Sequence, residues 1–321
     1  MAITAADYNN IRQKVIGVLG TGAGGYGQTP VSAAATSTNV ISATLWNGLR
    51  TDMIKSRQHQ TGEDESANLP ILTRTTPITE SLRQQFDAYA NIIVTNKKEI
   101  GLTGSIPQGQ NESFATSTVF SSIWTTTLYH KVVVTFASAL AANYWFNAGG
   151  QFRFYAAKVG TTVNSKDLEW STLIGNSTTK NGDANSGFGK VYMNYGTIST
   201  LPGTASSAGT AFPAFSFYNN SPSWNTVNLP TSATTIFFKQ FSGYGAVNRY
   251  QIQMYANNAT APTALTFLIT LQDLVAGNID DSITGQLTSY VDILRPTVSG
   301  GVTLNAPTRS TNTGLTTTVQ T

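Results

Sequence analysis

The chain of 321 residues carries very little charge: Asp, Glu, Lys and Arg make up 11% of it, although 40% of its residues are hydrophobic. Ordinary soluble proteins contain about 25% charged residues. The net charge of +3 is too small to indicate nucleic-acid binding, and the lack of cysteine excludes disulfides, thiolate metal sites and cysteine nucleophiles. Because so few charges leave little repulsion between copies, the composition favours a subunit packed against neighbours over a free enzyme.

The first hundred residues predict a helical region. They hold 9 Lys and Arg and 8 Asp and Glu, whereas the other 221 residues hold 10 and 8. Apolar residues recur at helical spacing over 4–20, over 42–62 and from Thr79 onward, and each segment starts at a Ser or Thr suited to an N-cap. We expect the first two helices to contact partner copies through Tyr8, Ile11, Val15, Trp46, Leu49 and Met53.

The segment after the first helix is rich in glycine. Residues Gly20-Thr21-Gly22-Ala23-Gly24-Gly25 match the GxGxxG pattern of dinucleotide-binding loops. That pattern binds pyrophosphate only between a strand and the start of a helix. Here a capped helical pattern precedes it, no helical stripe follows, and no acidic residue lies about 20 positions further on. We therefore expect no cofactor and interpret the segment as a helix C-cap followed by a flexible linker over 21–38.

Beyond residues 101–111, a stretch of Gly, Pro, Gln and Asn, the period of the pattern changes to that of strands. A strand is expected over 128–136, and a hairpin in which 144–146 and 151–155 flank Asn147-Ala148-Gly149-Gly150. A short helix is expected over 164–173. Further strands are expected over 191–195, 212–218, 236–241, 250–255, 265–271 and 287–294.

These elements predict an α+β, mainly β fold: an N-terminal helical segment followed by an antiparallel β-sandwich-like domain. We expect a helical docking and oligomerisation region at 1–104 and a β domain at 105–307. Residues 308–321 are low-complexity Thr, Ser and Asn, and predict a tail that is loose or ordered only by a neighbour.

No signal peptide or membrane-spanning segment is predicted. The start of the chain has neither a basic cluster nor an apolar run. The longest apolar stretch, 132–146, is interrupted by Thr135, Ser138 and Asn143, and it is too short to cross a bilayer. We expect a chain that is made in a cytoplasm and does not insert into membranes.

Few residues offer chemistry for catalysis or metal binding. The two histidines, His59 and His130, lack a second histidine at ligand spacing and are interpreted as packing or surface residues. Residues 181–187 place oxygen side chains at alternate positions, as calcium loops do, but Tyr192 stands where the closing carboxylate belongs. A polar turn is the preferred interpretation of 181–187, with cation binding left open. We expect no catalytic and no metal-binding residues.

Most aromatic residues beyond position 120 are assigned to the core of the β domain. Tyr218, Trp224 and Tyr244 differ because they lie beside Asn, Ser, Pro and Gly, in settings typical of loops. We expect these three side chains to be exposed and to contact a partner subunit or a glycan of a host surface.

An ordered series of short motifs resembles a family of virion structural proteins of large tailed phages, notably contractile-tailed phages of cyanobacteria. The motifs are residues 5–15, 18–22, 25–28, 46–52, 57–62 and 144–154, which read AADYNNIRQKV, VLGTG, GYGQ, WNGLRTD, RQHQTG and YWFNAGGQFRF. They touch both the helical third and the β region. The resemblance implies a place in a virion and no catalytic residues.

The main hypothesis is a non-enzymatic structural protein of a phage particle, assembled in the host cytoplasm. It would belong to the tail, the baseplate or a fibre, with copies of itself, as a trimer or hexamer, and other virion proteins as partners. One alternative is a capsid decoration or neck protein of the same particle. Others are a carbohydrate-binding β module used in host adsorption, and an enzyme that uses a cofactor or cleaves polysaccharide.

Overall fold

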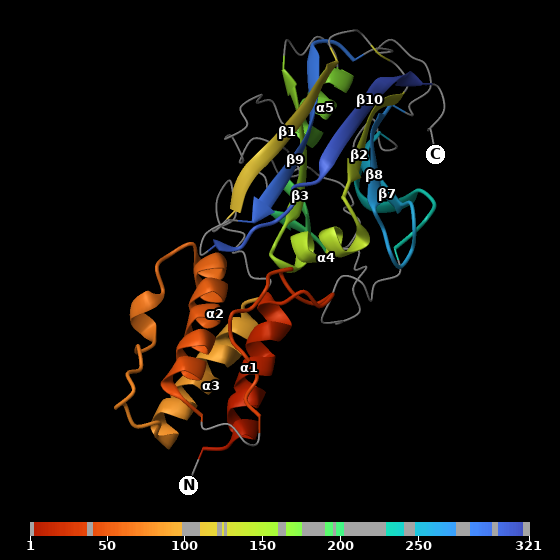
Figure 1. The fold of residues 1–321 in the computed structure, drawn as a ribbon. Coiled ribbons are helices and arrows are strands. Elements are labelled where there is room, and N and C mark those ends of the chain that lie inside the picture. Colours follow the sequence, from red (N-terminus) through yellow and green to blue (C-terminus); the bar gives the residue numbers. More distant parts are fainter. Residues whose placement is uncertain are drawn as a thin grey trace.

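The computed structural model describes a helical bundle attached to one end of a β sandwich (Figure 1). Helices precede antiparallel sheets along the chain, so the predicted α+β class is confirmed. The described residues are 3–36, 41–97, 110–120, 124, 127–159, 165–174, 190–194, 197–201, 229–240, 248–273, 283–296 and 301–316.

Three helices form the bundle: α1 (Ala5–Leu19), α2 (Ala43–Thr61) and α3 (Glu80–Thr95), with a 3-10 turn, η1 (Ser66–Asn68), before α3. Thr4 and Asp7 close a capping box, in which the Asp7 amide donates to Thr4 Oγ1 at 3.3 Å and the Thr4 amide donates to Asp7 Oδ2 at 2.8 Å. Thr79 caps α3 in the expected way, whereas Ser42 begins α2 without a side-chain cap. The predicted helices are confirmed.

The predicted linker after α1 is an extended strap that packs on the bundle. Asn9 exchanges two hydrogen bonds with the backbone of Ala35, at 2.8 and 2.9 Å. Buried Asp52 on α2 accepts from the amides of Val31 and Ser32, both at 2.9 Å. Side chains from α1 and α2 therefore satisfy the backbone of this strap, and the expectation of a flexible linker is wrong for the described residues 21–36.

Two antiparallel sheets of five strands pack face to face (Figure 1). The first has the order β1-β9-β3-β4-β5 and the second the order β10-β2-β8-β7-β6. The strands are β1 (Gln110–Phe120), β2 (Thr127–Thr135), β3 (Gln151–Val159), β4 (Lys190–Asn194), β5 (Thr197–Leu201), β6 (Thr234–Gln240), β7 (Arg249–Ala256), β8 (Ala264–Gln272), β9 (Gln286–Pro296) and β10 (Thr308–Thr316).

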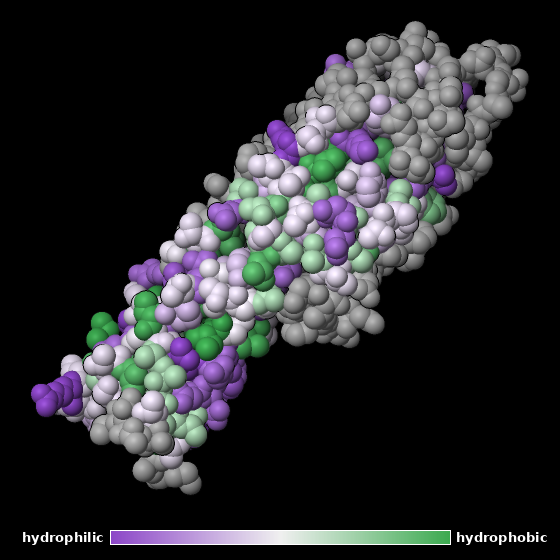
Figure 2. Space-filling model, turned by 45° about the vertical axis from the view of Figure 1, so that its right-hand side comes forward, coloured by the Kyte–Doolittle hydropathy of each residue, from purple (hydrophilic) through white to green (hydrophobic). Residues whose placement is uncertain are grey.

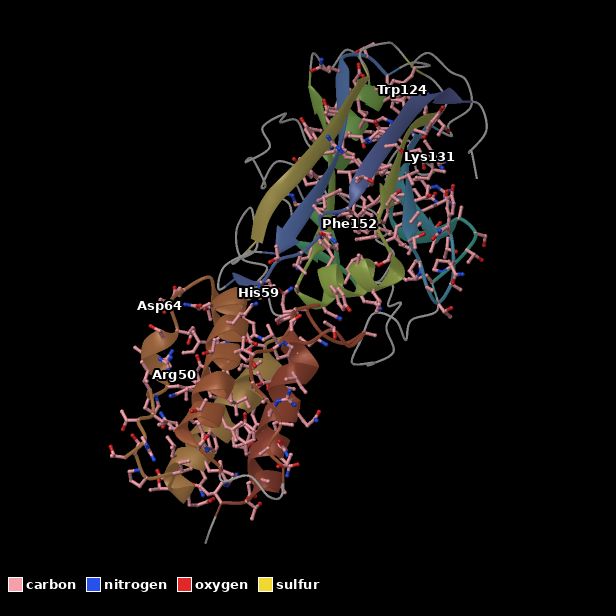
Figure 3. The ribbon with its side chains drawn as sticks, viewed as in Figure 1. Arg50, His59, Asp64, Trp124, Lys131 and Phe152 are labelled. Carbon is pink, nitrogen blue, oxygen red and sulfur yellow. The ribbon has the colours of Figure 1, made fainter. Side chains whose placement is uncertain are left out.

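Aromatic side chains fill the space between the two sheets. Phe152 of β3 contacts Phe267 of β8 across the sandwich with ring centroids 4.9 Å apart, and Figure 3 shows Phe152 inside it. Helix α5 (Ser165–Ile174), close to the predicted 164–173, adds Trp170, which meets Trp124 edge to face at 5.1 Å. The assignment of most aromatic residues to the core therefore holds for these described positions.

The predicted hairpin around Asn147-Ala148-Gly149-Gly150 is wrong. Residues Ala139–Asn147 form helix α4, which Ser138 caps by accepting from the Ala141 amide at 3.0 Å. Three alanines in the first turn and this cap favour a helix, and the aromatic residues Trp145 and Phe146 are buried in the core of the sandwich. Only the second predicted arm, 151–155, is a strand, as part of β3.

The C-terminal segment is also more ordered than predicted. Thr308–Thr316 form β10, which pairs with β2 without interruption from Thr308 opposite Thr135 to Thr316 opposite Thr127. A loose tail is therefore wrong for these residues, since a polar Thr-rich segment forms a strand where a neighbouring strand supplies backbone partners. Strands β1 and β5 were not predicted, and the predicted strand 212–218 lies outside the described residues.

Candidate functional site at the junction of the bundle and the sandwich

The six residues predicted to contact partner copies lie inside the bundle, so that prediction is wrong. Each is at most 1% exposed: Tyr8, Ile11, Val15, Trp46, Leu49 and Met53. Trp46 meets Tyr8 and Phe86 edge to face, at 5.5 and 4.7 Å, and so joins the three helices. The stripe of apolar residues on each helix packs against the other two helices of the same chain, so these six side chains are not available to a partner copy.

A groove on the outer surface of the bundle lies between α1 and the end of α3. It has a volume of about 550 Å³ and is lined by Gln13, Lys14, Gly17, Val18, Val94, Thr95 and Lys97. Of its two aliphatic lining residues, Val94 is 46% exposed and Val18 is buried. Lys14, which also lines the groove, pairs with Asp87 at 2.6 Å. The groove thus combines one exposed aliphatic side chain with two lysines.

A second groove, of about 710 Å³, lies at the start of α2. It is lined by Ile41, Ser42, Ala43, Thr44, Asn47, Leu72, Thr73, Arg74, Thr76 and Ile78. Asn47 closes its floor, donating to the Leu72 carbonyl at 2.8 Å and accepting from the Leu72 amide at 2.9 Å. This groove has a more polar lining than the one between α1 and α3.

The glycine-rich loop lies at the junction between the two modules. Its backbone folds back on the end of α1, where the Tyr26 amide donates to Val18 O at 2.8 Å and the Gln28 amide to Leu19 O at 2.9 Å. A Cβ on Gly25 would lie 2.0 Å from Gly20 O, so this turn requires glycine. Since helix α1 leads into the loop, the strand that a dinucleotide site needs is missing from the described fold here.

Helix α4, at the end of the sandwich, packs on this loop and bonds to its backbone. Asn147 Nδ2 donates to the carbonyls of Ala23 and Gly25 at 2.8 and 3.0 Å. The Tyr144 hydroxyl donates to Thr21 O at 2.6 Å. Gly27 holds φ at +74°, and a Cβ there would lie 2.4 Å from the ring of Tyr144. The loop and the helix therefore fit each other closely.

Two further contacts complete the junction. His59, near the end of α2 that faces the sandwich (Figure 3), is 4% exposed and donates from Nε2 to Ala148 O at 3.1 Å. Gln28 donates to Thr303 O at 2.8 Å, where the chain passes from β9 back to β10. Val302 and Ala148 belong to the same buried cluster as the bundle core. The hydrophobic core of the bundle thus extends across the predicted boundary near residue 104.

Sequence reasoning missed the junction residues Tyr144, Asn147 and Gln28. Their signal was visible, since Asn147 precedes a Gly pair and Gln28 follows the glycine-rich loop. Neither spacing could show that Asn147 bonds to a backbone carbonyl 124 residues earlier in the chain. The interpretation of His59 as a packing residue is consistent with its burial.

We expect Gly27→Ala to lower the free energy of unfolding by about 2 to 3 kcal/mol, because an L-residue is strained at this φ and its methyl meets Tyr144. Gly22→Ala, in the same loop with nothing within 4 Å of its Cβ, should change it by less than about 0.5 kcal/mol. Urea denaturation of the two variants measures the difference. Equal stabilities would show that the contact between Gly27 and Tyr144 does not constrain the loop.

Three ion pairs are buried in the described part of the sandwich. Arg153 of β3 contacts Asp292 of β9 by two hydrogen bonds, one of them from Nε at 2.8 Å, and both side chains are at most 1% exposed. On α5, Lys166 bonds Asp273 at 3.0 Å. Asp167 lies 3.3 Å from Lys158 and accepts from the Thr284 amide at 2.8 Å. These ion pairs tie strands and helix together within the fold.

His130 links the two sheets through the core. It is fully buried on β2, and its Nδ1 shares a hydrogen bond of 3.0 Å with Ser289 Oγ of β9. Burial, and secondarily the positive charge of Arg309, lowers the pKa of His130 to about 4. A Ser–His pair of this kind resembles a catalytic dyad in composition, but both side chains are fully buried.

This burial predicts acid sensitivity. Between pH 6.5 and 4 the unfolded chain binds a proton at His130 that the folded chain excludes, so stability is complete above the unfolded pKa and falls as the pH drops. At pH 5 the loss is about 2 kcal/mol. His130→Asn should remove this part of the pH dependence in urea titrations at pH 8 and pH 5. An unchanged pH dependence would contradict the assignment.

Other predicted site residues lie outside the described part of the chain: Tyr218, Trp224, Tyr244 and the oxygen-rich segment 181–187. In the described part, no three His, Asp or Glu side chains gather closely enough to hold a metal ion. None of the helices described has the length and apolar character that a bilayer-spanning helix requires.

Comparison with protein-family models, with curated proteins and with solved structures finds no match to this chain.

Proposed function

We propose that this protein is a non-enzymatic structural subunit of a phage virion, located in the tail, the baseplate or an attached fibre. It is assembled in the host cytoplasm with copies of itself and with other virion proteins. A trimer or hexamer would match the symmetry of such particles. The low charge of the sequence supports this proposal, because copies with few like charges pack closely.

The observation that carries the proposal is the convergence of separate motifs on the junction. Three motifs that resemble virion structural proteins, residues 25–28, 57–62 and 144–154, supply Gly27, His59 and Asn147. These residues meet where the bundle seats the sandwich. Turn motifs that resembled the family only by chance would not be expected to meet at one place in the structure. In this proposal the three motifs fix the helical bundle, which docks on the particle, to the β sandwich, which projects from it.

The described surface supports the same division of roles. Figure 2 shows an elongated body on which hydrophobic and hydrophilic residues are intermixed. The bundle carries the α1/α3 groove with exposed Val94, and we assign contacts with neighbouring subunits to this groove. Buried charges in the sandwich are paired across elements, which supports a role in holding the fold.

The direct test is the composition of particles from the host that makes this chain. Mass spectrometry of purified mature particles should find it in many copies, and antibody labelling should place it on the tail or baseplate. Its absence from mature particles, with a soluble form that turns over a substrate, would overturn the proposal. Labelling confined to the capsid or neck would move it to the alternative location.

Point variants test the role of the groove. Val94→Asp should leave the fold intact, because the side chain is 46% exposed, and should reduce incorporation into particles by at least about tenfold. Ile71→Asp, at a position 71% exposed and outside the groove, serves as the matched control and should be incorporated like the wild type. Equal incorporation of both variants would show that the groove is not the contact.

A further inference from the structure

Strand β10 presents an open edge. It is the last strand of its sheet, and among the described strands it pairs only with β2 (Figure 1). Thr308, Arg309, Ser310 and Thr311 are exposed one after another, so side chains on both faces of the strand are reachable from solvent. A strand edge of this kind offers a row of backbone donors and acceptors to another strand.

The other three sheet edges carry features that oppose such pairing. β1 has an irregularity in register between Glu112 and Phe114, and β6 has one between Thr235 and Phe237. β5 is only five residues long. Bulges and short edge strands are the usual protection against edge-to-edge association. In contrast, β10 runs for nine residues with an unbroken register. Among the described edges, β10 is therefore the one suited to accept a strand.

We propose that a second copy of this chain pairs with this edge, β10 against β10 in antiparallel orientation, about a two-fold axis at Asn312. The strand is centred on Asn312, since Thr308–Thr316 extends four residues to each side. A two-fold contact requires a self-complementary strand. The pairing joins the two five-stranded sheets into one continuous sheet of two copies.

The sequence of β10 suits this pairing. In this register Thr308 lies opposite Thr316, and Thr311 lies opposite Thr313, which places threonine pairs directly across the axis. The single charged residue, Arg309, lies opposite Leu315. The two copies of Arg309 are six residues apart along the strands, about 20 Å, which is beyond the screening length at physiological salt. A charged partner strand would gain little from so neutral an edge.

Of the two oligomers in the proposed function, this contact suits a hexamer built from three two-fold dimers and not a trimer, which has no two-fold axis. The inference does not depend on a place in a virion. It also differs from the α1/α3 groove, which lies on the bundle. Two kinds of contact, one two-fold and one on another surface, would be needed to extend an assembly beyond a dimer.

Cysteine cross-linking tests the register in the full-length protein, which has no cysteine of its own. Asn312→Cys places the two thiols directly opposite each other at a Cα separation of about 5 Å, within disulfide range. Thr308→Cys on the same strand places them about 27 Å apart. Mild oxidation should therefore convert most of the Asn312→Cys protein to a disulfide-linked dimer and leave Thr308→Cys largely monomeric.

Asn312→Lys provides a second measurement without oxidation, since it sets two ammonium groups opposite each other and should weaken the dimer by at least about tenfold in sedimentation. Failure of Asn312→Cys to cross-link, equal cross-linking of both cysteine variants, or an unchanged dimer in Asn312→Lys would each overturn the β10 contact. If particles still contain the chain in those cases, the proposed function stands and only this surface is wrong.

Discussion

Replacing Arg153 with methionine should lower the free energy of unfolding of the sandwich by about 3 to 5 kcal/mol. Arg153 and Asp292 are register partners on β3 and β9, on the face of the sheet opposite to the core residues Phe152 and Phe154. Removing the guanidinium deprives the buried Asp292 carboxylate of the cation that donates two hydrogen bonds to it. Arg153 also lies over the ring of Tyr155 at 5.4 Å, so its loss removes packing as well.

Two comparisons separate the buried charge from the loss of a side chain. The double variant Arg153→Met, Asp292→Leu should recover most of the stability, because it removes the buried carboxylate together with its cationic partner. Lys14→Met breaks the ion pair between Lys14, whose side chain is 36% exposed, and Asp87, whose side chain is 31% exposed. Because this pair is solvated, its loss should change the free energy of unfolding by less than about 1 kcal/mol. Urea denaturation measures all of these variants. A double variant as unstable as Arg153→Met would show that packing, and not the charge, carries the effect.

The sequence was sufficient where local signals determine the structure. Helices α1 and α3 begin at Thr4 and Thr79 because each hydroxyl accepts a backbone amide, an interaction encoded within four residues. The strands of the sandwich core, such as β8 with its nearly continuous burial, follow from runs of β-branched and aliphatic residues. Both kinds of signal are independent of distant segments.

The predictions from sequence are wrong where contacts with distant segments determine the local structure. Residues 139–147 contain Tyr-Trp-Phe, which is typical of strands, yet they form α4 because the junction and the sandwich core bury that helix. Thr308–Thr316 lacks any apolar alternation, and its structure comes from pairing with β2, more than 170 residues earlier. Local residue propensities indicate neither the burial of α4 nor the pairing of β10 with β2.

The candidate site was the least predictable part for the same reason. An apolar helical stripe looks the same whether its partner is another copy or another helix of the chain. The stripe therefore predicts an interface for Tyr8 and Trp46, which lie in the core of the bundle. The glycine-rich loop could be recognised as a C-cap from its spacing. Its contact with Asn147 depends on the fold as a whole, and no pattern in the loop indicates it.

Replacing Trp46 with alanine should destabilise the bundle by about 3 to 5 kcal/mol, the range expected for a large side chain removed from a packed core. Trp46 is fully buried and contacts an aromatic residue on each of the other two helices. Its Nε1 has no hydrogen-bond partner among the described residues, so the stabilising contribution of the indole comes from packing. A cavity of that size loosens all three helices together.

Trp46→Phe is the matched variant, because it keeps an aromatic ring and removes the unsatisfied N–H; it should lose only about 1 to 2 kcal/mol. Hydrogen exchange resolves the two modules. In Trp46→Ala the amides of α1, α2 and α3 should exchange faster by at least about tenfold, while those of β7 and β8 change less. Equal acceleration in β8 would mean that the bundle and the sandwich unfold as one unit, because the junction then transmits the whole loss of stability from one module to the other.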